Sequence, residues 1–524
     1  MNPEPTVEGL WQQAQQRFNG RDLDAARSAC EALLAMRPGH SGAHLMLADL
    51  CGRQDQQRQA TRHALAAAAG MGRETLQHIG AVGWRLISLG EYEQAMRLIR
   101  KLDLPRISTA PFLADLSQQL SILEQHEDAL RCLDAAIAHG MKAESACYLR
   151  GNYLRFLGRL EEAAQEYERS IALNPRFAYA HWALAYLDMT AGRDRRIDRI
   201  RGVLGPGGMP DRDRAYLGYA LFKELDAIDD TEAAWQALMD GASAKRRTVD
   251  YEARAELLLF DELIAACGPG FVGPATIEPT DRVPIFVLGM PRTGTTVVER
   301  ILGGHPQVTL CGELNDFRKQ YKWASDHACT GVIDRIGVAR LPAVDFGELG
   351  RRYLEHVAWR APSTRYFTDK QPGNWIVAGL ILKALPQAKI IHLRRNPMDT
   401  CFSNLKELFA AKFYPYSYRL DELAGHYRGY ARLMAHWHAI APGRILDVQY
   451  EDLVADPEGQ ARRLMACCGL EFNPGQLRIE TRAMPVSTAS SAQVRQAIHG
   501  RNVGGWKRYA SQLEPLQRLL DHDP

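Results

Sequence analysis

The segment from Gly289 to Thr296 has the residue types of a phosphate-binding loop. The apolar run Ile285–Leu288 precedes it, and a helical pattern begins at Thr295. A glycine-bearing turn between a strand and a helix can present backbone N–H groups to a phosphate. The spacing follows G-x-x-x-x-G-K-[ST], but Thr295 stands where that motif has its lysine. The loop therefore predicts an anion site that works without the lysine of the usual nucleotide-binding loop.

A second candidate phosphate site follows the apolar run Lys389–Leu393. Arg395 ends this predicted strand, and Asn396 and Pro397 are typical of a helix N-cap and a first helical residue. A phosphate there would meet a guanidinium fork and the positive end of a helix together. Ser403, two turns along the helix, could donate to the same group. The alternative is an arginine that pairs with a carboxylate at the end of a sheet.

The two candidate phosphate sites can form one binding site only if the strands that precede them end close together. Four short apolar runs alternate with amphipathic helical stretches in the second half of the chain. The runs are Ile285–Leu288, Tyr366–Thr368, Lys389–Leu393 and Ile445–Val448. This alternation predicts βαβ units and a parallel sheet that binds ligands at the carboxyl ends of its strands. Each candidate cluster directly follows one of the runs.

The first half of the chain repeats with a period of 34 residues. Ala95, Ala129 and Ala163 are 34 residues apart, as are Ala26 and Ala60. Each unit is typical of a helix–turn–helix with a small residue where the helices approach, which predicts a solenoid with a concave groove.

The segment "RSIALNPRFAYAHWALAYL", residues 169–187, resembles the tetratricopeptide repeat, and the resemblance covers roughly residues 6–240. It implies a groove that binds a peptide or protein, or a surface that forms a homodimer. The alternative is a spacer that only covers the next domain.

The expected organisation has two domains. We predict an N-terminal all-α tetratricopeptide solenoid with capping helices over residues 1–267 and a glycine- and proline-rich linker over 268–282. A C-terminal α/β three-layer domain with a parallel sheet should follow over 283–524.

Composition limits the cellular locations and the binding partners that we expect for this protein. The net charge of +2 argues against nucleic acid as the main partner. No apolar run approaches the length of a membrane span, and the N-terminus lacks the pattern of a signal peptide. Ten scattered cysteines favour a reducing, cytoplasmic location. Cys467–Cys468 and the histidines His436 and His438 show no partner ligands along the sequence, so we expect no metal site.

Four motifs together resemble the sulfotransferases, most closely the tyrosylprotein sulfotransferase branch. "PIFVLGMPRTGTT" resembles their 5'-phosphosulfate loop, and "RRNPMDTCFS" resembles their 3'-phosphate motif. "YEDLVADPE" (450–458) and "SSAQVRQAI" (490–498) match late segments of that group. The resemblance covers about residues 283–510. It implies a P-loop-like sulfotransferase fold and 3'-phosphoadenosine 5'-phosphosulfate (PAPS) as the donor, with no metal.

The resemblance also implies roles for particular residues. The expected donor-binding residues are Arg292, Thr293, Gly294, Thr295, Thr296, Arg395, Ser403 and Tyr450. Glu313, in a Cys-Gly-Glu setting, matches the catalytic base of the tyrosylprotein group, and Lys370 matches the lysine that neutralises the leaving oxygens. Ser491 matches a late serine near the leaving phosphate. Asp316 and His305 compete with Glu313 as the base, and a Glu313 that only pairs with Arg292 is the structural alternative.

The chain departs from the family pattern in one contact. Gly505 stands where the tyrosylprotein group has a donor-binding lysine before the tryptophan that matches Trp506. Either Lys507 and Arg508 replace that lysine or the contact is missing. The group's membrane anchor is not seen here, so the acceptor stays open among a peptide tyrosine, a glycan, a lipid and a small metabolite. A nucleotide phosphotransferase and a non-enzymatic scaffold are the rival functions.

Overall fold

The computed structural model describes residues 6–71, 76–205, 207–273, 280–329, 331–410, 413–479 and 498–521. The chain forms two compact units. Unit 1 comprises residues 1–140 and 315–362, and unit 2 comprises residues 141–314 and 363–524. The predicted domain borders, at residues 267 and 283, rest on sequence pattern, whereas the two units are defined by contacts. The borders therefore remain a prediction.

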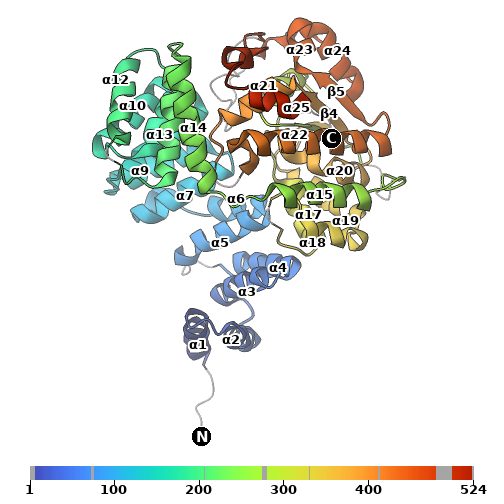
Figure 1. The fold of residues 1–524 in the computed structure, drawn as a ribbon. Coiled ribbons are helices and arrows are strands. Elements are labelled where there is room, and N and C mark those ends of the chain that lie inside the picture. The colour runs from blue at the N-terminus through green and yellow to red at the C-terminus, as the bar shows by residue number, and fades with distance from the viewer. Residues whose placement is uncertain are drawn as a thin grey trace. The chain divides into compact units, whose positions relative to one another are not determined.

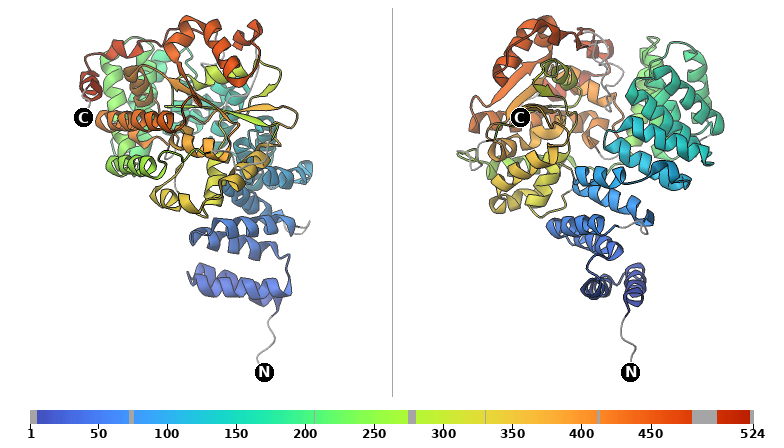
Figure 2. Two further views of the ribbon diagram at one scale, coloured as in Figure 1. Left: turned by 90° about the vertical axis from the view of Figure 1, so that its right-hand side faces the viewer. Right: turned by 180° about the vertical axis from the view of Figure 1, so that it is seen from behind.

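Unit 1 is helical, and its N-terminal helices pack as consecutive pairs. The helices are α1 (Val7–Asn19), α2 (Leu23–Met36), α3 (Ser41–Arg53), α4 (Gln57–Ala69), α5 (Leu76–Leu89), α6 (Tyr92–Arg100), α7 (Ala110–Ile122) and α8 (His126–Ala138). Contacts join α1 to α2, α3 to α4, α5 to α6 and α7 to α8. Figure 2 shows the first four helices as two stacked pairs in dark blue.

A later segment of the chain completes unit 1. It contains α17 (Asp316–Ala324), α18 (Arg335–Arg340) and α19 (Phe346–Val357). Nδ1 of His327 lies 2.7 Å from Asp55, in the turn before α4, and Arg340 lies 2.9 Å from the same carboxylate. Residues 315–362 are therefore tied to the N-terminal helices, although they lie far along the chain.

Unit 2 begins with further helices, some of which pack as consecutive pairs. They are α9 (Glu144–Leu157), α10 (Leu160–Leu173), α11 (Ala178–Ala185), α12 (Arg193–Leu204), α13 (Asp211–Asp226), α14 (Thr231–Arg247) and α15 (Ala253–Ala266). The alanines at the repeat period confirm the predicted helical repeat. Ala26, Ala60, Ala95, Ala129 and Ala163 are fully buried, each in the second helix of its pair.

The second half of unit 2 is built on a five-stranded sheet in the order β2-β3-β1-β4-β5. The strands are β1 (Val283–Gly289), β2 (Val308–Thr309), β3 (Tyr366–Asp369), β4 (Lys389–Arg394) and β5 (Ile445–Gln449). All four neighbouring pairs are parallel. The structure confirms the four predicted strands and adds β2, a two-residue edge strand that leaves no apolar run in the sequence.

Helices cover both faces of this sheet. On one face, strand residues such as Ile285, Val287 and Leu393 share a buried core with residues of α16 (Thr295–Leu302) and α24 (Pro457–Cys468). On the other face, His392 meets Tyr430 of α22 (Leu420–Ile440), the long helix beside β4 in Figure 1. Residues therefore alternate between two covered faces along each strand, as in a three-layer α/β domain. The structure confirms the predicted fold class.

The remaining helical elements of unit 2 surround the sheet. They are the 3-10 helices η4 (Pro372–Val377), η5 (Pro415–Tyr418), η6 (Pro474–Leu477) and η9 (Gly505–Tyr509), and the α-helices α20 (Ala378–Ala384), α21 (Pro397–Leu405), α23 (Tyr450–Ala455) and α25 (Glu514–Asp521). None of the helices within the described ranges is long and apolar enough to cross a membrane.

The repeat helices of unit 2 bond directly to the sheet region. The Tyr219 hydroxyl on α13 donates to the backbone oxygen of Leu405, at the end of α21, at 2.9 Å. Arg246 on α14 makes two bonds to the buried carboxylate of Glu422 on α22, at 2.8 and 2.9 Å. Helices α9–α15 and the sheet thus belong to one compact unit.

The contact between α13 and α14 gives the first prediction. A Cβ added at Gly218 would lie 2.6 Å from Cα of Gly241 and 2.9 Å from its nitrogen. We expect Gly218→Ala to lower the free energy of unfolding by about 1–3 kcal/mol, because the two helix backbones would have to separate. Thermal and urea unfolding, followed by circular dichroism, measure this change.

Gly202→Ala, in α12, is the matched control. No atom lies within 4 Å of a Cβ at that position. Alanine should therefore stabilise the helix there by roughly 0.8–1 kcal/mol. A Gly218→Ala protein as stable as the wild type would contradict the close packing of α13 and α14.

Candidate functional site

The loop after β1 has a backbone that only particular residues tolerate. Gly289 and Gly294 have positive φ values of 147° and 103°, and Arg292 between them has φ 67°. A Cβ at Gly289 would collide with the backbone oxygen of Leu393 on β4. A Cβ at Gly294 would lie 2.6 Å from the ring of Tyr450. The two glycines of the motif therefore allow the loop to pass close to β4 and α23.

The loop leads into the N-terminus of α16 without a side-chain cap. Gly294 is the N-cap residue, and the described part of the chain provides no side-chain cap hydrogen bond at this helix start. The hydroxyl of Thr293 donates instead to the backbone oxygen of Met290 at 2.8 Å. Thr295 and Thr296 are buried in the first turn. Uncapped N–H groups at a helix start form a ready site for an anion.

Arg395 joins the second predicted site to this loop. Its Nη1 donates to the backbone oxygen of Arg292 at 3.1 Å, and its Nη2 donates to the backbone oxygen of Asn502. The guanidinium lies 5.0 Å from the centre of the Tyr450 ring. The structure thus brings Arg395, Tyr450 and the glycine loop together.

The helix after Arg395 begins as predicted. Oδ1 of Asn396 accepts from the backbone nitrogens of Met398 and Asp399 at 3.0 and 3.2 Å, so Asn396 is the N-cap of α21. Ser403 is buried on this helix. The next residue, Asn404, donates to the backbone oxygen of Pro291 at 2.9 Å, which ties α21 to the glycine loop a second time.

Asp399, which the sequence analysis did not select, holds the segment around Gly505. Its two carboxylate oxygens accept from the backbone nitrogens of Gly504 at 2.7 Å and Trp506 at 3.1 Å. Arg508 lies 2.8 Å from Asp229 and 3.2 Å from Asp226. Arg508 is thus bound to the end of α13 and its following turn, and this pairing argues against Arg508 as the substitute for the family lysine.

Glu313 and Lys370 form an ion pair. Nζ of Lys370 donates to Oε1 of Glu313 at 2.7 Å. The lysine side chain is 2% exposed, whereas the glutamate side chain is 36% exposed. Lys370 directly follows β3, the neighbour of β1 in the sheet. A buried cation thus holds a carboxylate that remains partly exposed to solvent.

His305 and Asp316, the two other candidates for the base, lie in surroundings that suit a structural role. Nδ1 of His305 accepts from the backbone nitrogen of Gln307 at 3.2 Å, within the turn after α16. Asp316 is fully buried at the start of α17, in unit 1, and burial raises its pKa. Neither residue combines the exposure of Glu313 with its lysine partner.

Glu299 on α16 is a site residue that the sequence analysis missed. Its Oε1 accepts from the backbone nitrogen of Gly312 at 3.0 Å and from the Thr368 hydroxyl at 2.8 Å. The nitrogen of Cys311 donates to the same hydroxyl at 3.1 Å. Glu299 therefore anchors the turn that precedes Glu313 to both α16 and β3.

Burial raises the pKa of Glu299, while nearby Lys370 and the two hydrogen bonds act against the rise. The backbone nitrogen of Lys370 also donates to the oxygen of Gly312 at 2.9 Å. The sequence offered one indication that Glu299 belongs to the site, namely its place in the short helix that follows the buried strand β1.

Arg292 has a buried carboxylate as its neighbour. Its Nε lies 3.7 Å from Oε2 of Glu407, just beyond α21. Burial raises the pKa of Glu407, and the positive charge of Arg292 opposes that rise. Glu407 was also missed, because the pairing joins residues more than a hundred positions apart. Ser491, the remaining predicted site residue, lies outside the described residues.

Comparison with known proteins identifies two parts of the chain. Residues 284–474 match the sulfotransferase family, and residues 151–189 match the TPR repeat. An uncharacterized protein of Aquifex aeolicus is 31% identical over 70% of this chain and 49% of its own length. Protein-tyrosine sulfotransferase 2 of Gallus gallus is 25% identical over 37% of this chain and 53% of its own length.

Among solved structures, the sulfotransferase domain of the Synechococcus PCC 7002 olefin synthase aligns with 19% identity and a TM-score of 0.32. That alignment covers 48% of this chain and 98% of the domain. The chain spans about half the length of the two curated relatives described above. Residues 284–474 are a sulfotransferase-family domain, carried in the same chain as a tetratricopeptide repeat.

Proposed function

We propose that this chain transfers a sulfuryl group from PAPS to a hydroxyl acceptor, with Glu313 as the base. The pair between Lys370 Nζ and Glu313 Oε1, at 2.7 Å, carries the proposal. It lies where β3 ends, beside the strand that leads into the glycine loop. Sulfuryl transfer needs a base for the acceptor hydroxyl and a cation for the leaving oxygen, and this pair offers both.

The residues around the glycine loop suit a donor with phosphates at two ends. The uncapped start of α16, with Arg292 and Thr293–Thr296, would hold the 5' end. Arg395 and Ser403 would hold the 3'-phosphate, with Tyr450 beside them. Nε of Arg395 is buried and has no hydrogen-bond partner among the described residues. Burial lowers the pKa of this guanidinium, and the carboxylate of Asp399, 4.0 Å from Nη2, opposes that shift. A phosphate beside Nε would further offset the cost of burying the charge.

The bound donor supplies the sulfuryl group. Glu313 accepts the proton of the acceptor hydroxyl while the acceptor oxygen bonds to sulfur and the bond from sulfur to the phosphate oxygen breaks. Lys370 donates a hydrogen bond to that leaving oxygen, and the second product is 3',5'-bisphosphoadenosine. Without substrate, each group serves as the counter-ion of the other. Ser491 is proposed, from the family pattern, to assist at the leaving phosphate.

A peptide tyrosine is the acceptor that we propose, with the repeat helices recruiting the protein that carries it. A protein-tyrosine sulfotransferase among the relatives and the TPR match support this choice. We place the reaction in the cytoplasm as part of the same proposal. The ten free cysteines support a reducing compartment.

A labelled-sulfate transfer assay tests the function. The protein is incubated with ³⁵S-labelled PAPS and, separately, tyrosine peptides, a glycan mixture, lipids and small alcohols. Label on the peptide supports the proposed reaction and acceptor, and label on another acceptor corrects the acceptor only. Binding of the bisphosphate without transfer to any acceptor would favour a scaffold. Tighter binding of ATP–Mg²⁺ than of the bisphosphate would favour a phosphotransferase.

We expect Glu313→Ala to lower kcat at least about 100-fold, because the acceptor loses its base. Binding of 3',5'-bisphosphoadenosine, measured by calorimetry, should stay near the wild-type value. Glu458→Ala, which removes an exposed carboxylate from α24, is the control and should leave kcat unchanged. Equal turnover in Glu313→Ala and wild type would remove Glu313 from the role of base.

We expect Arg395→Ala to weaken bisphosphate binding by about 1.5–3 kcal/mol, the usual scale for a charged hydrogen-bonding partner. Calorimetry measures the affinity. Arg394→Ala removes the same charge from an adjacent, exposed side chain and should bind normally. Arg395→Lys keeps the positive charge but cannot reproduce both bonds of the guanidinium to the backbone oxygens. Its thermal unfolding therefore measures how much those bonds contribute to stability. Undiminished affinity in Arg395→Ala would refute the assignment of the 3'-phosphate.

Glu299 should act by positioning Glu313. We expect Glu299→Ala to lower the free energy of unfolding by about 1–3 kcal/mol, because buried donors lose their acceptor. It should also lower kcat at least about tenfold. Glu299→Gln keeps an accepting oxygen and should restore most of the stability. Turnover and thermal unfolding are measured for both variants, and a wild-type kcat in Glu299→Ala would contradict the role.

A further inference from the structure

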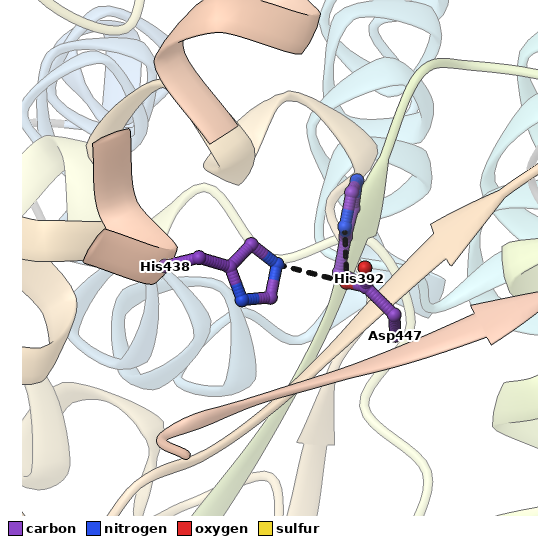
Figure 3. A group of neighbouring side chains, drawn as sticks. All are labelled: His392, His438 and Asp447. Atoms are coloured by element: carbon purple, nitrogen blue, oxygen red, sulfur yellow. Dashed lines mark hydrogen bonds and ion pairs between the residues drawn. The ribbon is translucent and has the colours of Figure 1, made fainter. Parts of the chain in front are cut away.

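Two histidines and an aspartate meet on one face of the sheet, outside the residues assigned to sulfuryl transfer. Nδ1 of His392 lies 2.8 Å from Oδ1 of Asp447, and Nε2 of His438 lies 2.9 Å from the same oxygen. Figure 3 shows the two rings directed at this carboxylate from different elements. Their ligand atoms all lie within 4.8 Å of one another.

The fold explains why these distant residues meet. His392 on β4 and Asp447 on β5 are directly paired in the parallel register, so their side chains leave the sheet on the same face. Tyr430 and His438 are eight residues apart on α22, close to the spacing that returns to one side of a helix. The helix therefore carries both side chains to the sheet face that contains His392.

The donor atoms are those that transition-metal ions prefer. Two imidazole nitrogens and one carboxylate oxygen form a ligand set suited to Zn²⁺, with a water in the fourth position. Zinc–ligand bonds of about 2.0–2.2 Å in a tetrahedral arrangement place ligand atoms roughly 3.3–3.5 Å apart. The two nitrogen–oxygen distances would thus have to open by about half an ångström, which small side-chain rotations can provide.

The surroundings of the cluster fit such a site. Nε2 of His392 is hydrogen-bonded to the Tyr430 hydroxyl at 2.5 Å, so Nδ1 is the nitrogen that faces Asp447. A second partner of this kind orients a metal-binding histidine. Nδ1 of His392 must be free of its proton to bind a metal. The neutral imidazole can shift that proton to Nε2, where the N–H donates a hydrogen bond to the Tyr430 hydroxyl, so His392 loses no proton on binding. His438 can change tautomer in the same way.

Two guanidinium groups contact Asp447, and Nη2 of Arg463 reaches only its backbone oxygen, at 3.4 Å. Nη1 of Arg394 is 3.4 Å from Oδ2 of Asp447, the oxygen that the histidines do not contact. The Arg394 side chain is 58% exposed, so it can turn into solvent when a cation binds. Oδ1 then remains available as the ligand.

We propose that His392, His438 and Asp447 form a binding site for a divalent transition-metal ion, with Zn²⁺ as the best match. The ion would tie β4, β5 and α22 together, three residues before Arg395. This site is independent of the proposed sulfuryl transfer, and its test does not use activity. The sequence alone offered His438 no partner ligand, whereas the fold supplies two.

Zinc binding to the full chain tests the site. Protein treated with a chelator and dialysed is titrated with ZnCl₂ against a chromophoric competitor, and elemental analysis counts the ions retained. We expect one Zn²⁺ per chain and a higher midpoint of thermal unfolding in its presence. His438→Ala should weaken binding at least about tenfold, since even outer partners of a metal site contribute that much.

His436→Ala is the matched control. His436 lies two residues from His438, but its Nε2 is hydrogen-bonded to the backbone oxygen of Cys267 at 2.9 Å. This variant should bind zinc as the wild type does. Asp447→Asn keeps an accepting oxygen but loses the charge, so it should fold normally by circular dichroism and also bind at least about tenfold more weakly. No retained zinc, or equal affinity in the three variants and wild type, would overturn the site.

Discussion

The close approach of β1 to β4 at Gly289 is the constraint on which the functional site depends. A side chain at this position would collide with the backbone oxygen of Leu393, so only glycine lets the two strands run side by side to their ends. The loop after β1 consequently lies within reach of α21. Arg395 then bonds to the oxygen of Arg292, and Asn404 bonds to that of Pro291. Two regions that are far apart in the sequence are thereby hydrogen-bonded to each other.

Features governed by local chemistry could be predicted from the sequence. The strands β1, β3, β4 and β5 follow from apolar runs, and the start of α21 follows from Asn396 and Pro397. The repeat follows from small residues at a fixed period, because only a small side chain fits where two helices cross. The glycine loop was recognisable because its spacing expresses a backbone requirement. The edge strand β2 was missed because two residues carry too little pattern.

Features that depend on pairing across the fold could not be predicted. Glu299 contacts Thr368, 69 residues away, and nothing near either residue indicates the other. Glu407 meets Arg292 and Asp399 meets the turn at Gly504 for similar reasons. Glu313 and Lys370 were each expected at the site only through family resemblance, and their ion pair was not predicted. Physical reading of the sequence could supply the types of residue at the strand ends, but their partners are decided by the order of strands in the sheet.

The bonds between the repeat helices and the sheet in unit 2 bear on how the protein can be divided for study. Glu422 is buried and receives both of its bonds from Arg246, while Leu405 accepts from Tyr219. A fragment that starts at the linker would leave that carboxylate without its cation and would bare an apolar surface to water. Such a fragment should aggregate. A version that begins at α9 would in turn leave His327 and Arg340 without Asp55, so the full chain is the sounder choice for expression.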